Sequence, residues 1–423
     1  MNNPFSDKKR DRLVIFDGAI GTEIERRSGN STGTKKTELP DLKNLYNKEL
    51  VKKVHISYAK AGADFLTTNT FSANPFRLSK TGKEELIEDI NYAGAELAKE
   101  AAKEIRGDSE LPLVAGSIGP SGENMLPIGD LTFDDMKEGF LKQAKALKDG
   151  GADWIVIETM DSLREAKAAL MAAKEVCLPT ITSMTYDSNA TTNHGSTAKA
   201  AGVVLEKNGT YVIGANCGMG PEDYPSVVEG LGSFSCKPIM VEPNAGKPKI
   251  IGGETQYQMN EREFCKHVGN FIDRLSGIGS CCGSNPRFTE RLFRQFGNRK
   301  KHSNSKKSGD WISSNREVRP IPKNFHSVEI ETGQLASTDI QETESALPLI
   351  DFMTQKGDPI ELEKKLAMDF LQFRSKRPIG FVVRNLDFLA LCLKTYRGIP
   401  PIKFTGRNEK GKVICEELGG LLI

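Results

Sequence analysis

The sequence predicts an α/β fold for its first 297 residues, in the form of a (β/α)8 TIM barrel. Eight short apolar runs, each ending in small or polar residues, recur between about residues 13 and 297. A stretch of helical composition separates each run from the next, and eight such units are what a closed barrel requires. An open doubly wound sheet is the structural alternative.

The predicted strands are almost continuously apolar, as is typical of parallel strands that are buried on both faces. The first reads LVIFDGAIGT and the last reads SGIGSCCGSNP. The eight runs begin, in order, at Leu13, Asp64, Leu111, Asp153, Leu178, Thr210, Lys237 and Ser276. Between them lie amphipathic segments such as 83–105, in which apolar residues recur at three- and four-residue spacing. This alternation of strand and helix indicates a parallel sheet covered by helices.

The composition changes after Gly297. Residues 298–345 are polar, basic at their start and poor in apolar side chains, so we expect a polar linker that is disordered. Residues 346–423 again show helix and strand patterns, including the strands RPIGFVV (377–383) and PPIKF (400–404). These units are too few to close a second barrel, and we therefore expect a partial α/β segment.

The overall charge is nearly balanced, with 58 Lys and Arg residues against 56 Asp and Glu residues. This balance gives no reason to expect nucleic acid or a membrane as a partner. The polar first twelve residues do not resemble a signal peptide, and no run approaches the roughly 18 apolar residues of a membrane span. We therefore expect a cytoplasmic protein, in which sparse cysteines favour metal binding or catalysis over disulfides.

Chemically distinctive residues follow the predicted strands. In barrels and in open α/β sheets alike, ligands bind at the carboxyl ends of the strands, so these residues predict an active site at one rim. They are Asp17, Asn69, Ser117, Glu158, Cys217, Asn244, Cys281 and Cys282.

Three of these residues, Cys217, Cys281 and Cys282, form a candidate metal site. The glycines at 279 and 283 allow the backbone to turn, so that both adjacent thiolates can reach one ion. Zinc favours tetrahedral sulfur coordination, and three protein ligands leave the fourth position for substrate. A thiol bound there has a lowered pKa and can attack an electrophilic methyl group. The alternative is that the adjacent cysteines are small core residues.

Seven motifs carry a family resemblance. They are DGAIGTE (17–23), GADFLTTNTFSAN (62–74), GSIGPSGE (116–123), GADWIVIETM (151–160), GANCGMGP (214–221), PNAGKP (243–248) and GSCCGS (279–284). Together they resemble the homocysteine S-methyltransferase family, which includes the homocysteine domain of cobalamin-dependent methionine synthase and betaine–homocysteine methyltransferase. The resemblance covers about 285 of the 423 residues.

The resemblance implies roles for individual residues. It makes Cys217, Cys281 and Cys282 zinc ligands, and it makes Asn244 a group that reaches the metal when homocysteine is absent. Glu158 would hold the substrate ammonium, and the turn Asp17–Gly18–Ala19 would offer N–H groups to the substrate carboxylate. Asp17 and Glu158 are thus the catalytic candidates, and Asn69 and Ser117 complete the predicted substrate site. Departures from the family pattern at Ile20, Ser280 and Ser284 remove no ligand.

The implied activity is zinc-dependent methylation of homocysteine to methionine, with a methylcorrinoid on a partner protein as donor. Betaine, a methylsulfonium donor, another acceptor thiol, or a zinc-binding scaffold without turnover remain open. Residues 377–404 resemble part of the pterin-binding barrel of cobalamin-dependent methionine synthases. Val383 stands where that family places a pterin-binding aspartate, so we expect a truncated remnant without folate binding. The oligomeric state is left open.

Overall fold

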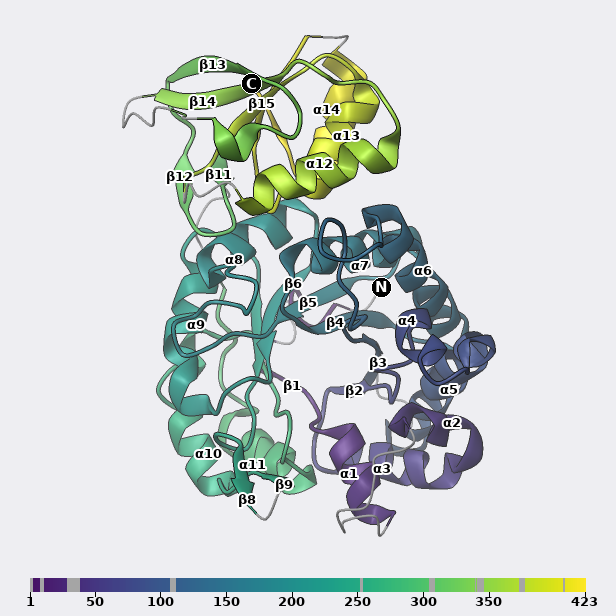
Figure 1. The fold of residues 1–423 in the computed structure, drawn as a ribbon. Helices are drawn as coiled ribbons and strands as arrows, with labels where there is room; N and C mark the ends of the chain where they lie inside the picture. Colours follow the sequence, from purple (N-terminus) through teal and green to yellow (C-terminus); the bar gives the residue numbers. More distant parts are fainter. Residues whose placement is uncertain are drawn as a thin grey trace.

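The computed structural model describes residues 3–7, 11–28, 39–106, 112–251, 254–303, 309–338, 340, 346–372, 377–405 and 408–423. Its ribbon shows a ring of strands and helices, with a smaller α/β unit stacked on one side (Figure 1).

The larger unit is an eight-stranded parallel sheet in the order β1-β10-β7-β6-β5-β4-β3-β2. A bridge between Phe16 and Phe65 joins the two end strands and brings the sheet almost to closure. The predicted barrel is therefore confirmed. Its strands are β1 (Val14–Ile15), β2 (Phe65–Thr67), β3 (Leu113–Ile118), β4 (Trp154–Met160), β5 (Thr180–Met184), β6 (Val212–Asn216), β7 (Ile239–Glu242) and β10 (Gly277–Ile278).

Helices cover the outside of the barrel, and several begin at a capping side chain. Thr132 and Asp135 form a reciprocal capping box at the start of α6, and Ser162 caps α7. The longer helices are α1 (Ile20–Arg27), α3 (Lys48–Lys60), α5 (Ile87–Arg106), α6 (Phe133–Asp149), α7 (Leu163–Glu175), α8 (Ala198–Lys207), α9 (Tyr224–Gly232), α10 (Glu261–Val268) and α11 (Pro286–Phe296). Short elements are η1 (Pro40–Leu42), α2 (Lys43–Tyr46), α4 (Pro75–Ser79), η2 (Glu84–Leu86), η3 (Pro221–Asp223), η4 (Ile272–Arg274) and the hairpin β8 (Lys249–Ile251)–β9 (Glu254–Gln256). None of the described helices has the length and apolar run needed to cross a bilayer.

Aromatic side chains fill the barrel interior. The rings of Phe16 and Phe65 stack with centroids 4.6 Å apart, and Trp154 meets Phe65 edge to face at 5.7 Å. Phe5 packs against all three rings. Because this cluster is apolar, it offers no charged partner to a ligand, and we expect the site at the carboxyl ends of the strands.

The structure differs from the expected linker over residues 298–345. The chain first stays on the barrel, where the Arg299 carbonyl accepts from the Leu13 amide at 2.7 Å. It then forms an antiparallel hairpin, β11 (Trp311–Ser313) and β12 (Val318–Pro320), and a seven-residue strand, β13 (Asn324–Ile330). Most of β13 is partly or fully exposed at a sheet edge, so its sequence is polar and mimics a linker. Residues 304–308, 339 and 341–345 lie outside the described residues.

The second unit is a five-stranded parallel sheet in the order β13-β14-β15-β16-β17. Its further elements are β14 (Ala346–Phe352), β15 (Gly380–Val383), β16 (Pro401–Phe404), β17 (Leu421–Leu422), α12 (Pro359–Gln372), α13 (Leu386–Thr395), α14 (Asn408–Leu418) and the short η5 (Leu335–Ser337). A separate apolar core, built around Phe352, Phe381 and Phe388, holds this sheet to its helices.

Buried charges join the two units. Arg164 of α7 and Glu363 of α12 form an ion pair whose side chains are each 5% exposed. Glu363 also accepts from the Phe133 amide at 2.8 Å, and the Lys167 ammonium donates to the Leu393 carbonyl at 2.7 Å. Burial lowers the pKa of Lys167 to about 7. Residues 346–423 are therefore packed on the barrel helices rather than trailing from them.

We expect Glu363→Gln to destabilise the full chain by about 3–5 kcal/mol, because it leaves the Arg164 guanidinium buried without its counter-charge. Glu361→Gln, on an exposed part of the same helix, is the matched control and should change stability by less than about 1 kcal/mol. Chemical denaturation of both variants measures the difference. If the two variants were equally stable, the Arg164–Glu363 ion pair would contribute little to the stability of the chain.

Candidate active site

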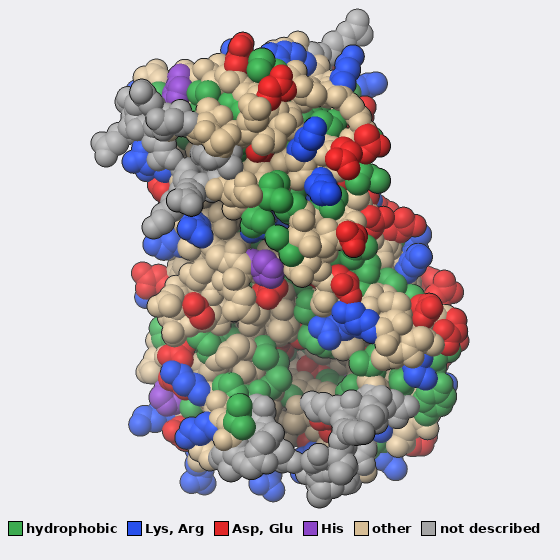
Figure 2. Space-filling model, viewed as in Figure 1, with side chains coloured by type: hydrophobic (Ala, Val, Ile, Leu, Met, Phe, Trp, Pro, Cys, Tyr) green, Lys and Arg blue, Asp and Glu red, His purple; other side chains and the backbone are tan. Residues whose placement is uncertain are grey.

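A cavity of about 370 Å³ opens at the carboxyl ends of the barrel strands. The space-filling view shows a hollow at the mouth of the barrel on this face (Figure 2). The structure brings the predicted residues to this cavity, with Asn244 just outside its lining. Those that line it are Asp17, Gly18, Ala19, Asn69, Ser117, Glu158, Cys217, Cys281 and Cys282.

The three candidate thiols lie together at one side of the cavity. Their sulfur atoms are all within 4.8 Å of one another, and those of Cys217 and Cys282 are 3.8 Å apart. All three cysteines are partly buried and free of disulfides. Hydrogen bonds from Cys281 and Cys282 lower the pKa of Cys217, while the pKa of each of the other two is raised. Such a cluster of sulfur donors can hold a soft or borderline metal ion.

The backbone is shaped to bring these thiols together. Cys217 has φ +60°, a left-handed conformation that is uncommon for a residue with a side chain. Its amide donates to the Glu242 carbonyl at 3.0 Å, and its carbonyl accepts from the Tyr224 hydroxyl at 2.9 Å. Gly283 has φ +80°, and a Cβ there would lie 2.4 Å from Tyr257. Only glycine therefore fits immediately after the cysteine pair.

Asn244 lies beside the thiol cluster. Its side chain is 1% exposed and hydrogen-bonds to Cys217. Among the described residues, its buried Oδ1 atom has no hydrogen-bond partner. A buried amide oxygen without a partner is costly, so this atom is suited to a cation next to the three sulfurs.

Glu158 ends the apolar part of β4 with its carboxylate towards the cavity. The Ser117 hydroxyl donates to Oε1 at 2.5 Å, and the Asn216 amide donates to Oε2 at 3.2 Å. Burial raises the pKa of Glu158 to about 7, the Ser117 hydrogen bond opposes this, and negative charge on Cys217 adds to it. Ser117 therefore orients and stabilises the ionised Glu158.

Three more acids share this space. One is Asp41, which accepts from the Ser72 amide at 2.8 Å and whose pKa burial raises to about 6. Asp17 is 1% exposed and accepts from the Thr67 amide at 2.7 Å, and burial raises its pKa well above the usual range. Glu242, at the end of β7, is 7% exposed, and burial and repulsion from Glu158 and Asp17 raise its pKa as well. Each acid takes up protons unless a cation compensates its charge.

Two further predicted residues, Ala19 and Asn69, line the cavity, but their polar groups already have hydrogen-bond partners. Ala19 is the N-cap of α1, whose amino end opens on the cavity, although its amide already donates to Ser284 Oγ at 3.2 Å. Asn69 lines the cavity, but its Nδ2 atom donates to Pro40 O and Asn44 Oδ1. Its amide group therefore fixes the segment that follows α1 rather than offering free donors.

Sequence reasoning missed Glu242, Asn216 and Tyr257. Glu242 follows the apolar run IMV as Glu158 follows WIVI, so the same signal could have found it. Asn216 precedes Cys217 and orients both Glu158 and Thr159. Tyr257, in the loop after β9, hydrogen-bonds to Cys282. This contact joins distant segments, so no local sequence pattern predicts it.

Comparisons with known proteins agree on one family. The homocysteine S-methyltransferase family model matches residues 14–296. Methionine synthases of Mycobacterium leprae (strain TN) and Mycobacterium tuberculosis (strain ATCC 25618 / H37Rv) are each 28% identical over 284 residues. These matches cover 65% of this chain and 24% of each relative, so the chain spans about a quarter of the length of these methionine synthases.

Solved structures support the fold. The metallated form of the homocysteine methyltransferase MmuM from Escherichia coli superposes with a TM-score of 0.57 at 22% identity, covering 69% of this chain and all of that one. The oxidized form gives a TM-score of 0.56 at 22% identity, covering 70% of this chain and 100% of that one. At this identity the likeness shows the barrel alone.

The raised pKa of Glu158 predicts a pH-dependent stability. The native state holds this proton up to about pH 7, whereas the unfolded chain releases it near its usual pKa of 4.5. The unfolding free energy of the metal-free protein should therefore fall between these pH values and lose no more from this group above them. Denaturant titrations over pH 4–9 should show a smaller fall for Glu158→Gln. Superimposable profiles would mean that Glu158 is solvated like a surface carboxylate.

Proposed function

Because the chain belongs to the homocysteine S-methyltransferase family, we propose that this methyltransferase transfers a methyl group to the sulfur of homocysteine and forms methionine. One observation carries the proposal: a single cavity holds three clustered thiols together with four acidic side chains of raised pKa. The thiols suit a metal that binds the acceptor sulfur, and the acids suit the ammonium of an amino acid.

Zinc is the metal that we propose, with Cys217, Cys281 and Cys282 as its ligands. The sulfur donors favour zinc over harder ions, and the unpartnered Oδ1 of Asn244 offers a fourth ligand when homocysteine is absent. Bound zinc would lower the pKa of a coordinated thiol and keep its sulfur nucleophilic. The strained Cys217 and the Gly283 turn hold the ligands in place before any metal arrives.

The acidic side chains would recognise the substrate's ammonium group. We assign Glu158 as its main partner, because hydrogen bonds from Ser117 and Asn216 already orient its carboxylate. A bound cation would lower the pKa of Glu158 and hold it ionised. Asp17 adds negative charge nearby, while the adjoining Gly18–Ala19 turn and the amino end of α1 suit the substrate carboxylate.

We propose a methylcorrinoid on a partner protein as the methyl donor. The similarity to methionine synthases supports this choice. The sequence of residues 377–404, which resembles part of a pterin-binding barrel, leads to the same expectation. The test incubates the zinc-loaded chain with homocysteine and one donor at a time: methylcobalamin, betaine or S-methylmethionine. Mass spectrometry then detects the methionine that is formed. If methionine forms only with betaine or S-methylmethionine, that compound is the donor and not the corrinoid. If no donor yields methionine, the chain is better explained as a scaffold without turnover.

Removing one thiol should remove most of the metal. We expect Cys217→Ala, Cys281→Ala and Cys282→Ala each to lower zinc content from about one ion per chain, because only two sulfur ligands remain. Cys236→Ala is the matched control, since Cys236 is also a partly buried free cysteine but lies outside the cluster. Elemental analysis after dialysis measures the difference. Full occupancy in the Cys282 variant would exclude that residue as a ligand.

Glu158→Gln should weaken homocysteine binding by about tenfold to a hundredfold, because a charge-assisted hydrogen bond contributes roughly 1.5–3 kcal/mol. Its zinc content should hardly change, since sulfur atoms hold the metal. Titration calorimetry with homocysteine measures the loss.

The control ligand is a thiol of similar length without the amino group. It should bind the wild type and Glu158→Gln about equally, because it presents no ammonium. Equal losses for both thiols would mean that Glu158 acts by supporting the structure. An unchanged homocysteine affinity would separate Glu158 from the substrate altogether.

A further inference from the structure

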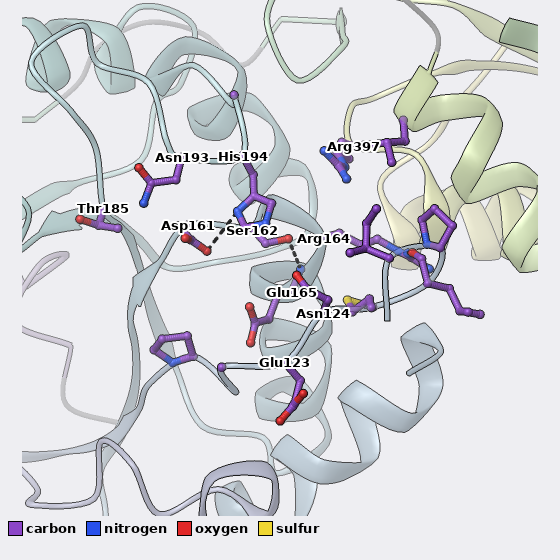
Figure 3. Close-up of a pocket in the computed structure, with 18 of the residues that line it drawn as sticks. Glu123, Asn124, Asp161, Ser162, Arg164, Glu165, Thr185, Asn193, His194 and Arg397 are labelled. Carbon is purple, nitrogen blue, oxygen red and sulfur yellow. Dashed lines mark hydrogen bonds and ion pairs between the residues drawn. The ribbon is translucent and has the colours of Figure 1, made fainter. Parts of the chain in front are cut away.

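A second cavity, of about 710 Å³, lies where the second α/β unit meets the barrel. Figure 3 shows side chains from the barrel and Arg397 from the second unit converging on it. Arg397 follows α13, Arg316 lies in the turn between β11 and β12, and Arg77 belongs to α4. The cavity therefore depends on three parts of the chain that are distant in sequence.

The acidic side chains of this cavity already have partners. Asp161 pairs with His194 at 3.3 Å, as the dashed line in Figure 3 marks, and Glu123 pairs with Lys80 at 2.6 Å. Glu165 accepts from the Ser121 amide at 2.7 Å. None of these three acids therefore forms an ion pair with Arg77, Arg316 or Arg397 in the described part of the chain.

The arginines Arg77, Arg316 and Arg397, by contrast, form no ion pair with an acid among the described residues, although the charge of Arg77 lowers the pKa of Asp41. Arg77 donates from Nε to the Pro120 carbonyl at 2.7 Å, and no ion pair of Arg77 is found in the described ranges. For the guanidinium groups of Arg316 and Arg397, the described part of the chain offers neither an ion pair nor a hydrogen bond. Arg397 is only partly exposed, and burial lowers its pKa.

Positive charge is therefore concentrated in the cavity. Burial, with Arg397 as an additional repulsive charge, lowers the pKa of Arg164 to about 10 although Arg164 is paired with Glu363. Cations that approach one another in a partly desolvated space are unfavourable unless an anion lies between them. Freely solvated arginines would not explain this arrangement, because Arg77 and Arg397 are both partly buried.

We propose that this cavity binds the phosphate or carboxylate group of a small molecule, with Arg397, Arg316 and Arg77 as its main ligands. Guanidinium groups bind both oxyanions through paired N–H donors, and this geometry favours arginine over lysine. The site is separate from the proposed homocysteine cavity and needs the second α/β unit. That unit would thus contribute ligand-binding residues.

The two cavities meet at Thr159. This residue lines both of them and directly follows Glu158. Its backbone has φ +59°, and Asn216 holds it by accepting from its amide at 2.7 Å and donating to its Oγ1 at 2.8 Å. A ligand in the arginine cavity would therefore share one lining residue with the acceptor site.

The test is titration calorimetry of the full chain with two probes, inorganic pyrophosphate and malonate, at constant ionic strength. We expect at least one probe to bind, and Arg397→Ala to weaken it by about tenfold to a hundredfold. Arg316→Ala should weaken the same probe by a smaller factor, because Arg316 is more exposed. The probe that loses affinity identifies the ligand as a phosphate or a carboxylate.

Arg262→Ala is the matched control, because it removes the same charge from an exposed position on α10 outside the cavity. It should leave probe binding unchanged. Thermal unfolding checks that Arg397→Ala is folded, and Arg316→Ala, a change at an exposed residue, tests the site independently of that outcome. Binding of neither probe, or equal losses in Arg262→Ala and both cavity variants, would overturn the proposal. Neither result depends on methyl transfer, so the proposed function is tested separately.

Discussion

Acidic side chains and thiols crowd one poorly solvated rim, where all of them except Cys217 favour their neutral forms unless a cation is present. Burial raises the pKa of Asp17 and Glu242 well above their usual range, and that of Glu158 to about 7. The aromatic filling of the barrel cannot compensate these charges, because it is apolar. The rim is thus arranged for ligands that bring positive charge, which are a metal ion and an ammonium group.

The scaffold holds this rim in a conformation that an isolated chain would avoid. Cys217 and Thr159 both have positive φ, which costs of order 1 kcal/mol or more for residues with side chains. Asn216 lies between them, and its side chain bonds both to Thr159 and to Glu158. One asparagine at the end of β6 thereby couples the orientation of the acid to the strand end that presents the first thiol.

Much of the barrel could be predicted from the sequence, because buried parallel strands leave continuous apolar runs and their polar ends mark the rim. The three thiols could be expected to meet for the same reason. The strand β13 could not be predicted, since an exposed edge strand has the composition of a linker. Neither could the ion pair of Glu363 with Arg164 or the place of Arg397 beside the barrel, because these contacts join segments more than a hundred residues apart. Long-range pairing of charges leaves no periodic signal.

The arginine cavity also bears on why the second unit is packed so firmly. An open five-stranded sheet would need only apolar contacts to dock on helices, yet this one buries the Arg164–Glu363 ion pair and satisfies Lys167 with a backbone carbonyl. Directional contacts of this kind fix orientation more strictly than apolar packing does. A fixed orientation is what Arg397 requires if it is to line one cavity together with residues of the barrel. The interface and the arginine cavity therefore result from one arrangement, in which the barrel rim supplies the cavity of thiols and acids and the second unit completes the arginine cavity.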